Sequence, residues 1–318
     1  MEVLELKQDT PETKKQRSAI SVKNVLFATD FSATSETALP YASAICHRFG
    51  STLHVAHVLS DANLLLMTGG VDYMSVETVY EDAHSQAEEK VRQVASRLSN
   101  IPHRTYVRHG QVWPNLSDIV SENKIDLIIV GTHGRSGLGK FVLGSVAEDI
   151  LRSAPCPVLT VGPRVRGHAR LPELHGTDRE IAPVDLELHR IVYATNFTPA
   201  SLKVARVAIS LAEEFESQLT LLHVIEDYSE LEKRPGPIET GVCQLQALVP
   251  RNATLAYLPD PVIEFGIAWE CIVNTAAERE ADLIVLGARP RDGRTRMPWS
   301  TVHRVVAHAN CPVLTVRG

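Results

Sequence analysis

The sequence has little cysteine, and its cysteines do not cluster. Five of the 318 residues are cysteine, and no two of them stand in a CxxC spacing. This pattern excludes a disulfide framework and a cysteine-based zinc site. We interpret these residues as reduced thiols that lie mostly in the core. They are Cys46, Cys156, Cys243, Cys271 and Cys311.

Long hydrophobic runs and an excess of positive charge are also missing. The strong apolar run at 127–130 is far shorter than the roughly 20 residues that a membrane span needs. The first 20 residues are charged throughout and contain no apolar segment typical of a secretion signal, so we expect a cytoplasmic protein. The net charge of −6 disfavours a large nucleic-acid-binding surface, because phosphate binding relies on clustered Lys and Arg.

Common catalytic signatures are absent as well. The chain has no GxSxG elbow, no GxxxxGK[ST] phosphate loop, no GxGxxG after its first predicted strand and no DFG motif. The spacing of its histidines and cysteines does not indicate a nucleophile with a general base. We therefore predict no catalytic residues and no metal held by protein ligands alone.

An internal repeat defines the domain organisation. Residues 25–32 (VLFATDFS) match residues 191–198 (IVYATNFT), and CPVLTV occurs at both 156–161 and 311–316. The offset between the copies falls from 166 to 156 residues along the repeat, so the second copy lacks ten residues in its middle. We predict a tail at 1–20, a first domain at 21–162, a linker at 163–188 and a second domain at 189–318.

Short β-rich runs alternate with helical patterns in the first copy, which is typical of a parallel sheet built from βαβ units. Apolar residues recur at helical spacing from Val76 to Leu98, and a second helical pattern runs from Val146 to Arg152. We predict strands at 24–29, 52–59, 103–109, 126–130 and 157–161. The expected fold is α/β, with two tandem copies of an open five-stranded, doubly wound parallel sheet. Such sheets bind ligands beyond the carboxyl ends of their strands, where the strand order reverses.

A glycine-rich loop follows the fourth predicted strand and leads into a helix, from Gly131 to Ser145. Glycines let the backbone approach phosphate oxygens closely, and the free N–H groups of a helix start favour an anion. In the alternative interpretation, Ser145 and Glu148 form a capping box and the glycines only build a loop. Because loop cations are usually solvated, we leave three loop residues outside the predicted site: His133, Arg135 and Lys140.

These residues carry a resemblance to a known family. The spacing Gly131-x2-Gly134-x9-Gly144-Ser145, with Asp30 at the end of the first strand, resembles the ATP-binding branch of the universal stress protein family. The resemblance implies ATP between the first and fourth strands, with Mg²⁺ or Mn²⁺ carried by the phosphates. It implies contacts of Asp30 and Val58 with adenine, of Val130 and Gly131 with ribose, and of Gly134, Gly144, Ser145 and Val146 with the phosphates.

Other functions remain open for some of these residues. Asp30 could simply cap the first helix together with Ser32, and we expect Ser32 and Thr198 to cap the first helix of their copies. We interpret His57 and His223, which occupy matched positions, as core histidines. The resemblance also implies that last strands associate, so the two copies would form a pseudo-twofold pair within one chain, and a homodimer is possible.

The second copy departs from the glycine pattern. Its loop is one residue shorter, with Pro290 in place of Gly134, Trp299 in place of Gly144 and Asn196 in place of Asp30. Proline removes an N–H group and tryptophan occupies the space that phosphate oxygens need, so we predict no ATP binding there. A cluster of loop arginines could hold another anion or an acidic partner, although an exposed basic loop is the favoured interpretation. It comprises Arg289, Arg291, Arg294 and Arg296.

Together these patterns predict an ATP-binding stress-response protein. The nucleotide in the first domain would act as a switch for a protein partner, with at most slow ATP hydrolysis. Two alternatives remain: an ATP-hydrolysing or adenylate-handling enzyme on the same fold, and a dimerisation scaffold that binds no nucleotide.

Overall fold

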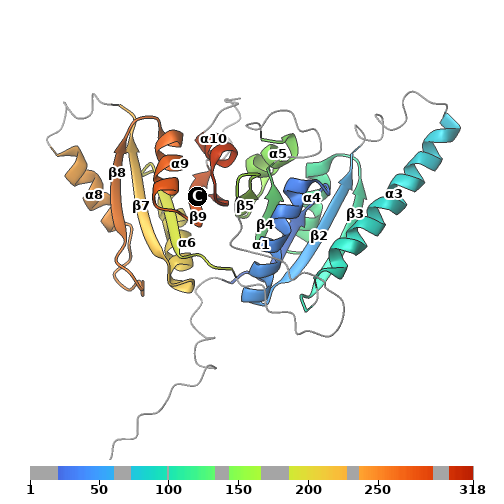
Figure 1. Cartoon of the computed structure of the whole chain (residues 1–318), viewed down its shortest axis with the longest axis horizontal. Coiled ribbons are helices and arrows are strands. Elements are labelled where there is room, and N and C mark those ends of the chain that lie inside the picture. Colours follow the sequence, from blue (N-terminus) through green and yellow to red (C-terminus); the bar gives the residue numbers. More distant parts are fainter. Residues whose placement is uncertain are drawn as a thin grey trace, which may run out of the picture.

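A computed structural model gives the fold of the chain (Figure 1). It describes residues 21–60, 73–98, 100–132, 143–165, 186–227, 236–288 and 301–317, with backbone only at 73–78 and 237. The predicted tail and most of the predicted linker lie outside these residues.

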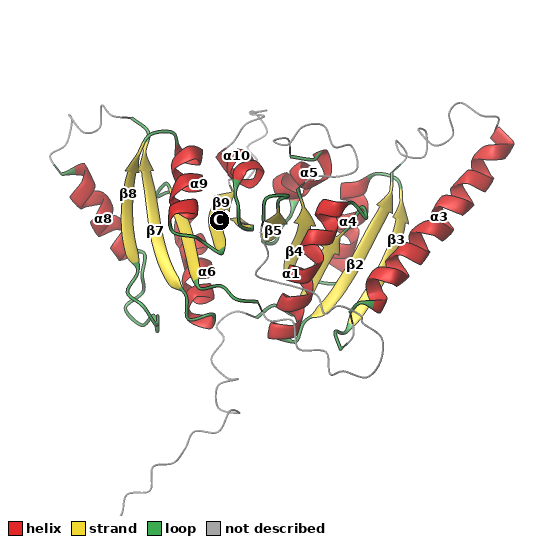
Figure 2. Ribbon diagram, viewed as in Figure 1, coloured by secondary structure: helices red, strands yellow, loops and turns green. Residues whose placement is uncertain are grey.

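The first copy has five strands and four described helices, in the alternating order that its sequence predicts (Figure 2). The elements are β1 (Asn24–Ala28), α1 (Ala33–Phe49), β2 (Thr52–Leu59), α3 (Tyr73–Ser96), β3 (His103–His109), α4 (Val112–Glu122), β4 (Leu127–Gly131), α5 (Ser145–Ser153) and β5 (Val158–Val161). Each predicted strand is present, with ends that differ by at most one residue.

The second copy repeats this order. Its elements are β6 (Arg190–Thr195), α6 (Ser201–Glu214), β7 (Gln218–Ile225), α8 (Pro237–Ala247), β8 (Asp260–Phe265), α9 (Ala268–Glu278), β9 (Leu283–Ala288), α10 (Thr301–His308) and β10 (Val313–Arg317). The helix α8 has 11 residues, where α3 at the equivalent place has 24. The ten residues that the second copy lacks fall in this region.

All ten strands form one sheet, in the order β3-β2-β1-β4-β5-β10-β9-β6-β7-β8. Neighbouring strands within each copy are parallel, whereas β5 and β10 are antiparallel and join the copies. Two matched side chains support this seam: the Thr160 hydroxyl donates to the Val313 carbonyl at 3.1 Å, and the Thr315 hydroxyl donates to the Val158 carbonyl at 3.2 Å. The expected fold class is confirmed, and the last strands pair within the chain.

Helices cover both faces of the sheet because alternate strand residues point to opposite sides. Phe27 packs in a core with α1, α3, α6 and α8, whereas its neighbour Leu26 packs in a second core with α4, α5, α9 and α10. Both side chains are fully buried. This layering leaves the two edges formed by the strand ends as the places where ligands can reach the sheet.

The predicted helix caps are right in one copy and wrong in the other. Ser32 is the N-cap of α1, and its hydroxyl accepts a hydrogen bond from the Ser35 N–H. Thr198 does not cap α6, which begins only at Ser201 and has Ala200 as an N-cap without a side-chain bond. The physical reason is an additional turn: the Ser201 N–H donates to the Thr198 carbonyl at 2.8 Å and delays the start of the helix.

Candidate nucleotide-binding site

The first copy reverses its strand order between β1 and β4. From β1 the chain adds β2 and β3 on one side, and it then returns to add β4 and β5 on the other side. The helices that follow β1 and β4, which are α1 and α5, therefore pack on opposite faces of the sheet. In doubly wound folds, ligands usually bind beyond the carboxyl ends of the strands at such a reversal of strand order. Asp30 and Gly131 both lie at this edge.

The segment after β1 is held by its own side chains. The Thr29 hydroxyl accepts the Phe31 N–H at 3.0 Å, and an Asp30 carboxylate oxygen accepts the Ser32 N–H at 3.0 Å. Phe31 has a φ of 60°, in the left-handed region that few non-glycine residues adopt. Asp30 thus takes part in the turn that starts α1, as its structural interpretation expects, and its contact with a ligand remains a prediction.

The β2 end adds a buried histidine. One ring nitrogen of His57 lies 2.8 Å from the Thr29 carbonyl, and the Phe31 ring lies 4.4 Å from the His57 ring. His57 is 5% exposed, which confirms its interpretation as a core residue. The neighbouring Val58 side chain is also buried, so only its backbone can meet a ligand.

The same contacts recur in the second copy, but His223 is only half-buried, so its interpretation as a core residue is not confirmed. A His223 ring nitrogen lies 2.8 Å from the Thr195 carbonyl, and Phe197, with a φ of 56°, lies 4.3 Å from the His223 ring. The two phenylalanines are not among the residues predicted from the sequence. Their signal was available, because Phe31 and Phe197 are separated by the same 166 residues as the two histidines.

Gly131 ends β4 against the start of α1. A Cβ atom at this position would lie 2.9 Å from the Ser35 nitrogen and 2.9 Å from the Thr34 carbonyl carbon and oxygen. Only glycine allows this approach of two backbones. The preceding Val130 is buried, so it too offers a ligand only its backbone.

The start of α5 lies next to the end of β4. The Gly144 N–H donates to the Thr132 carbonyl at 2.7 Å, and Gly144 is the N-cap, with φ −63°, ψ 145° and no side-chain cap. Ser145 and Val146 are exposed. The capping box of Ser145 and Glu148 is therefore wrong: Ser145 is the first helical residue, and the Glu148 N–H bonds to the Gly144 carbonyl.

Several predicted residues lie outside the described part of the chain. In the first copy these are Gly134 and the loop residues His133, Arg135 and Lys140. In the second copy they are Pro290, Trp299 and the arginines of 289–296. The other predicted site residues lie at one edge of the sheet, on the ends of β1, β2 and β4 and the start of α5: Asp30, Val58, Val130, Gly131, Gly144, Ser145 and Val146.

At the corresponding edge of the second copy, two contacts of the described residues are longer than in the first copy. An Asn196 side-chain oxygen accepts the Thr198 N–H at 3.4 Å, compared with 3.0 Å for Asp30 and Ser32. At Gly287, which matches Gly131, a Cβ atom would meet only a Val204 methyl group at 3.4 Å. The close backbone approach is therefore particular to the first copy.

Within the ranges described above, no group of three or more His, Cys, Asp or Glu side chains could hold a metal ion. No helix in the same ranges is long and apolar enough to cross a membrane.

The fold and this edge define an α/β protein with two tandem, doubly wound copies. The sequence model of the universal stress protein family matches residues 21–162 and 187–317, so the chain belongs to this family of stress-response proteins. The relatives include a universal stress protein of Methanocaldococcus jannaschii, which is 27% identical over 139 residues that make up 44% of this chain and 81% of the relative. A universal stress protein A homologue of Coxiella burnetii is 31% identical over 140 residues, 44% of this chain and 95% of that protein.

A solved structure with a similar fold covers both copies. The crystal structure of a universal stress protein from Archaeoglobus fulgidus aligns with a TM-score of 0.65 at 19% identity, over 92% of this chain and 98% of that one. The tandem arrangement thus has a counterpart among solved proteins of the family.

Proposed function

We propose that the first copy binds ATP and that the occupied site presents a surface to a protein partner. The support is the contrast between two helix starts at one sheet edge. The α1 start is satisfied by the Ser32 hydroxyl, whereas the α5 start has only Gly144 as its N-cap and no side-chain bond. The first N–H groups of a helix carry partial positive charge and need acceptors, and phosphate oxygens supply them.

In this proposal the two sides of the site take different parts of the nucleotide. The phosphates meet Gly144, Ser145 and Val146 at the α5 start, and Gly134 in the preceding loop. Adenosine lies over the β1, β2 and β4 ends, where the side chains of Val58 and Val130 are buried and their backbone groups make the contacts. Mg²⁺ or Mn²⁺ would come with the phosphates, because hard cations prefer oxygen ligands.

Asp30 has a role in the proposal that can be separated from its role in the fold. In the second copy, Asn196 makes the matching turn with its side-chain oxygen. Asparagine can therefore replace aspartate here without loss of the turn. In the proposal, the Asp30 carboxylate accepts a hydrogen bond from the adenine amino group. Removal of its charge should therefore reduce the binding free energy of ATP by about 1.5–3 kcal/mol.

We propose domains at 21–162 and 189–318, no ATP binding in the second copy, and a cytoplasmic protein with at most slow ATP hydrolysis. The second copy contributes β10, which covers the β5 edge that would otherwise be open to other strands. Its role is then structural, and a homodimer would use another surface.

The experiment is a calorimetric titration with ATP and Mg²⁺ on four proteins. Wild type should bind one ATP per chain. Gly144→Val should lose binding while its circular dichroism spectrum stays that of wild type, because a φ of −63° suits any residue and the side chain only fills phosphate space. Asp30→Asn should bind about tenfold or more weakly, and the matched control Asn196→Asp should bind like wild type.

Other results would assign another function. Unchanged affinity in Gly144→Val refutes the phosphate placement. Phosphate release far above the slow background would favour an ATP-hydrolysing enzyme. Absence of a titration signal in the wild type would favour a nucleotide-free scaffold.

A further inference from the structure

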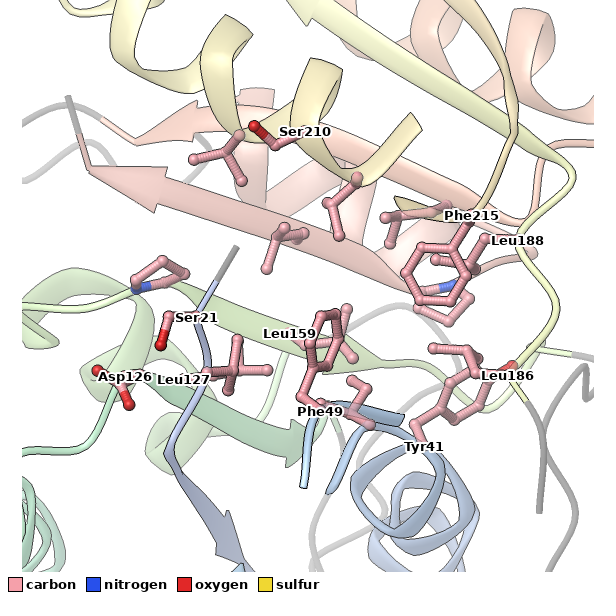
Figure 3. A pocket seen from close by; sticks show the side chains of 18 of the residues that line it. Ser21, Tyr41, Phe49, Asp126, Leu127, Leu159, Leu186, Leu188, Ser210 and Phe215 are labelled. Carbon is pink, nitrogen blue, oxygen red and sulfur yellow. The ribbon is translucent and has the colours of Figure 1, made fainter. Parts of the chain in front are cut away.

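A cleft lies between α1 and α6, over the seam that joins the two copies (Figure 3). It has a volume of about 320 Å³. Leu127 and Leu283, the first residues of β4 and β9, belong to its lining. The cleft is therefore at the amino-terminal edge of the strands, opposite the edge that holds the candidate nucleotide site.

The lining is apolar and nearly symmetric. Residues at matched positions of the two copies face each other, and Figure 3 shows Phe49 and Phe215 approaching the cleft from its two sides. On its floor, Leu159 and Leu314 are direct partners across the antiparallel seam. A pocket of this size and composition between two domains is the usual setting of a small-molecule site.

One wall departs from the symmetry. The α6 helix contributes Arg206 and Ser210 to the lining, where α1 has Pro40 and Ala44 at the matched positions. Arg206 is exposed, and no carboxylate of the described residues lies within ion-pair distance of it. A single cation thus stands beside an apolar cleft.

The other charged residue of the lining, Asp126, is hydrogen-bonded to the backbone of the protein itself. Among the described lining residues only Asp126 and Arg206 are charged. The Asp126 carboxylate accepts the Lys23 N–H at 2.8 Å and the Asn24 N–H at 3.0 Å, and so fixes the chain before β1. The charge left for a ligand is positive.

We propose that this cleft binds a single-chain amphiphile with a carboxylate head, such as a medium-chain fatty acid. The alkyl chain lies along the apolar lining, where its removal from water drives binding. The carboxylate pairs with the Arg206 guanidinium, which is built for planar oxyanions. The site is independent of the nucleotide proposal, because it uses other residues at the opposite edge of the sheet.

The head group is tested with decanoate and decanol, titrated into the full-length protein below their aggregation range. Wild type should bind one decanoate per chain. Arg206→Glu should weaken decanoate about fivefold or more, as expected for reversal of one solvent-accessible ion pair, and should leave decanol within about twofold. The matched control is Lys203→Glu, an exposed cation on the same helix outside the cleft lining, which should leave both ligands unchanged.

The chain position is tested by filling the cleft. Ser210 and Val207 are half-buried and line it, so Ser210→Phe and Val207→Phe should each reduce decanoate binding at least tenfold. An unchanged unfolding midpoint in urea shows that each variant is folded.

Three results would overturn the proposal. They are no decanoate binding by wild type, equal weakening by Arg206→Glu and Lys203→Glu, and wild-type affinity in both filled variants. A concentration-dependent dimer that Ser210→Phe abolishes would assign the cleft to a second copy of the chain instead.

Discussion

Replacement of Gly131 by alanine should destabilise the protein, whereas the same change at the matched Gly287 should not. At Gly131 the new Cβ would lie 2.9 Å from backbone atoms of Thr34 and Ser35. At Gly287 it would meet one Val204 methyl group at 3.4 Å, which is ordinary contact. The two variants make the same chemical change at equivalent places, so each is the control for the other.

The expected magnitude follows from two opposing effects. Alanine restricts the unfolded chain at both positions, which stabilises each variant by about 0.4–1 kcal/mol. At Gly131 this gain is outweighed by overpacking, which costs about 1–3 kcal/mol. The first turn of α1 cannot easily move away, because the Ser32 hydroxyl bonds to the Ser35 N–H and the Ser35 hydroxyl bonds to Thr29 at 2.6 Å. We expect Gly131→Ala to be about 1–2 kcal/mol less stable than wild type.

The assay is urea unfolding of wild type and both variants, followed by circular dichroism. The midpoint should fall for Gly131→Ala with an unchanged slope, and it should stay or rise slightly for Gly287→Ala. The ATP affinity of Gly131→Ala should fall as well, because the added Cβ moves the start of α1 away from the end of β4. Equal midpoints for the two variants, or a stabilised Gly131→Ala, would refute this account of the close approach.

The remaining predictions concern buried thiols and the contact between the copies. Burial raises the pKa of Cys46 and of Cys311 to about 12. A thiol reagent at pH 8 should therefore modify the exposed Cys243 in the native protein, and Cys46 and Cys311 only after unfolding. Rapid modification of Cys46 or Cys311 in the native protein would contradict the buried packing. These thiols ionise near pH 9 in the unfolded chain but stay protonated in the folded protein. The free energy of unfolding should therefore fall above pH 9, by about 1.4 kcal/mol per pH unit for each thiol. Cys46→Ala should make this fall less steep. Across the copies, Arg48 donates to the Glu214 carboxylate at 3.1 Å and to its backbone carbonyl at 2.8 Å. A double-mutant cycle with Arg48→Ala and Glu214→Ala should give a coupling of about 0.5–1 kcal/mol that shrinks in high salt; no coupling at low salt would show that the pair contributes nothing.

The repeat and the strands could be predicted because they depend on local sequence. Alternation of short β-rich runs with helical periods sets the order of elements, and the two CPVLTV segments fix the register of the copies. The α3 helix at 73–96 follows the apolar spacing that begins at Val76. The predicted cap at Ser32 is confirmed. It could be predicted because a helix cap depends on only the three residues that follow it.

What could not be predicted depends on contacts between distant segments. The crowding at Gly131 arises from α1, which is about a hundred residues earlier in the chain, and no local pattern encodes it. The cleft between α1 and α6 exists only because β5 and β10 pair, which sets two equivalent helices side by side. At Thr198 a local signal failed, because the turn that ends at Ser201 competed with the helix start.

The most direct test of the central claim is the amount of nucleotide that the protein carries. Freshly purified protein is denatured, and the released nucleotide is identified by chromatography and mass spectrometry and counted per chain. The account predicts one adenine nucleotide per chain, held by the first copy. Two per chain would contradict the silent second copy, and none, together with no binding of ATP and Mg²⁺ on titration, would contradict the nucleotide site itself.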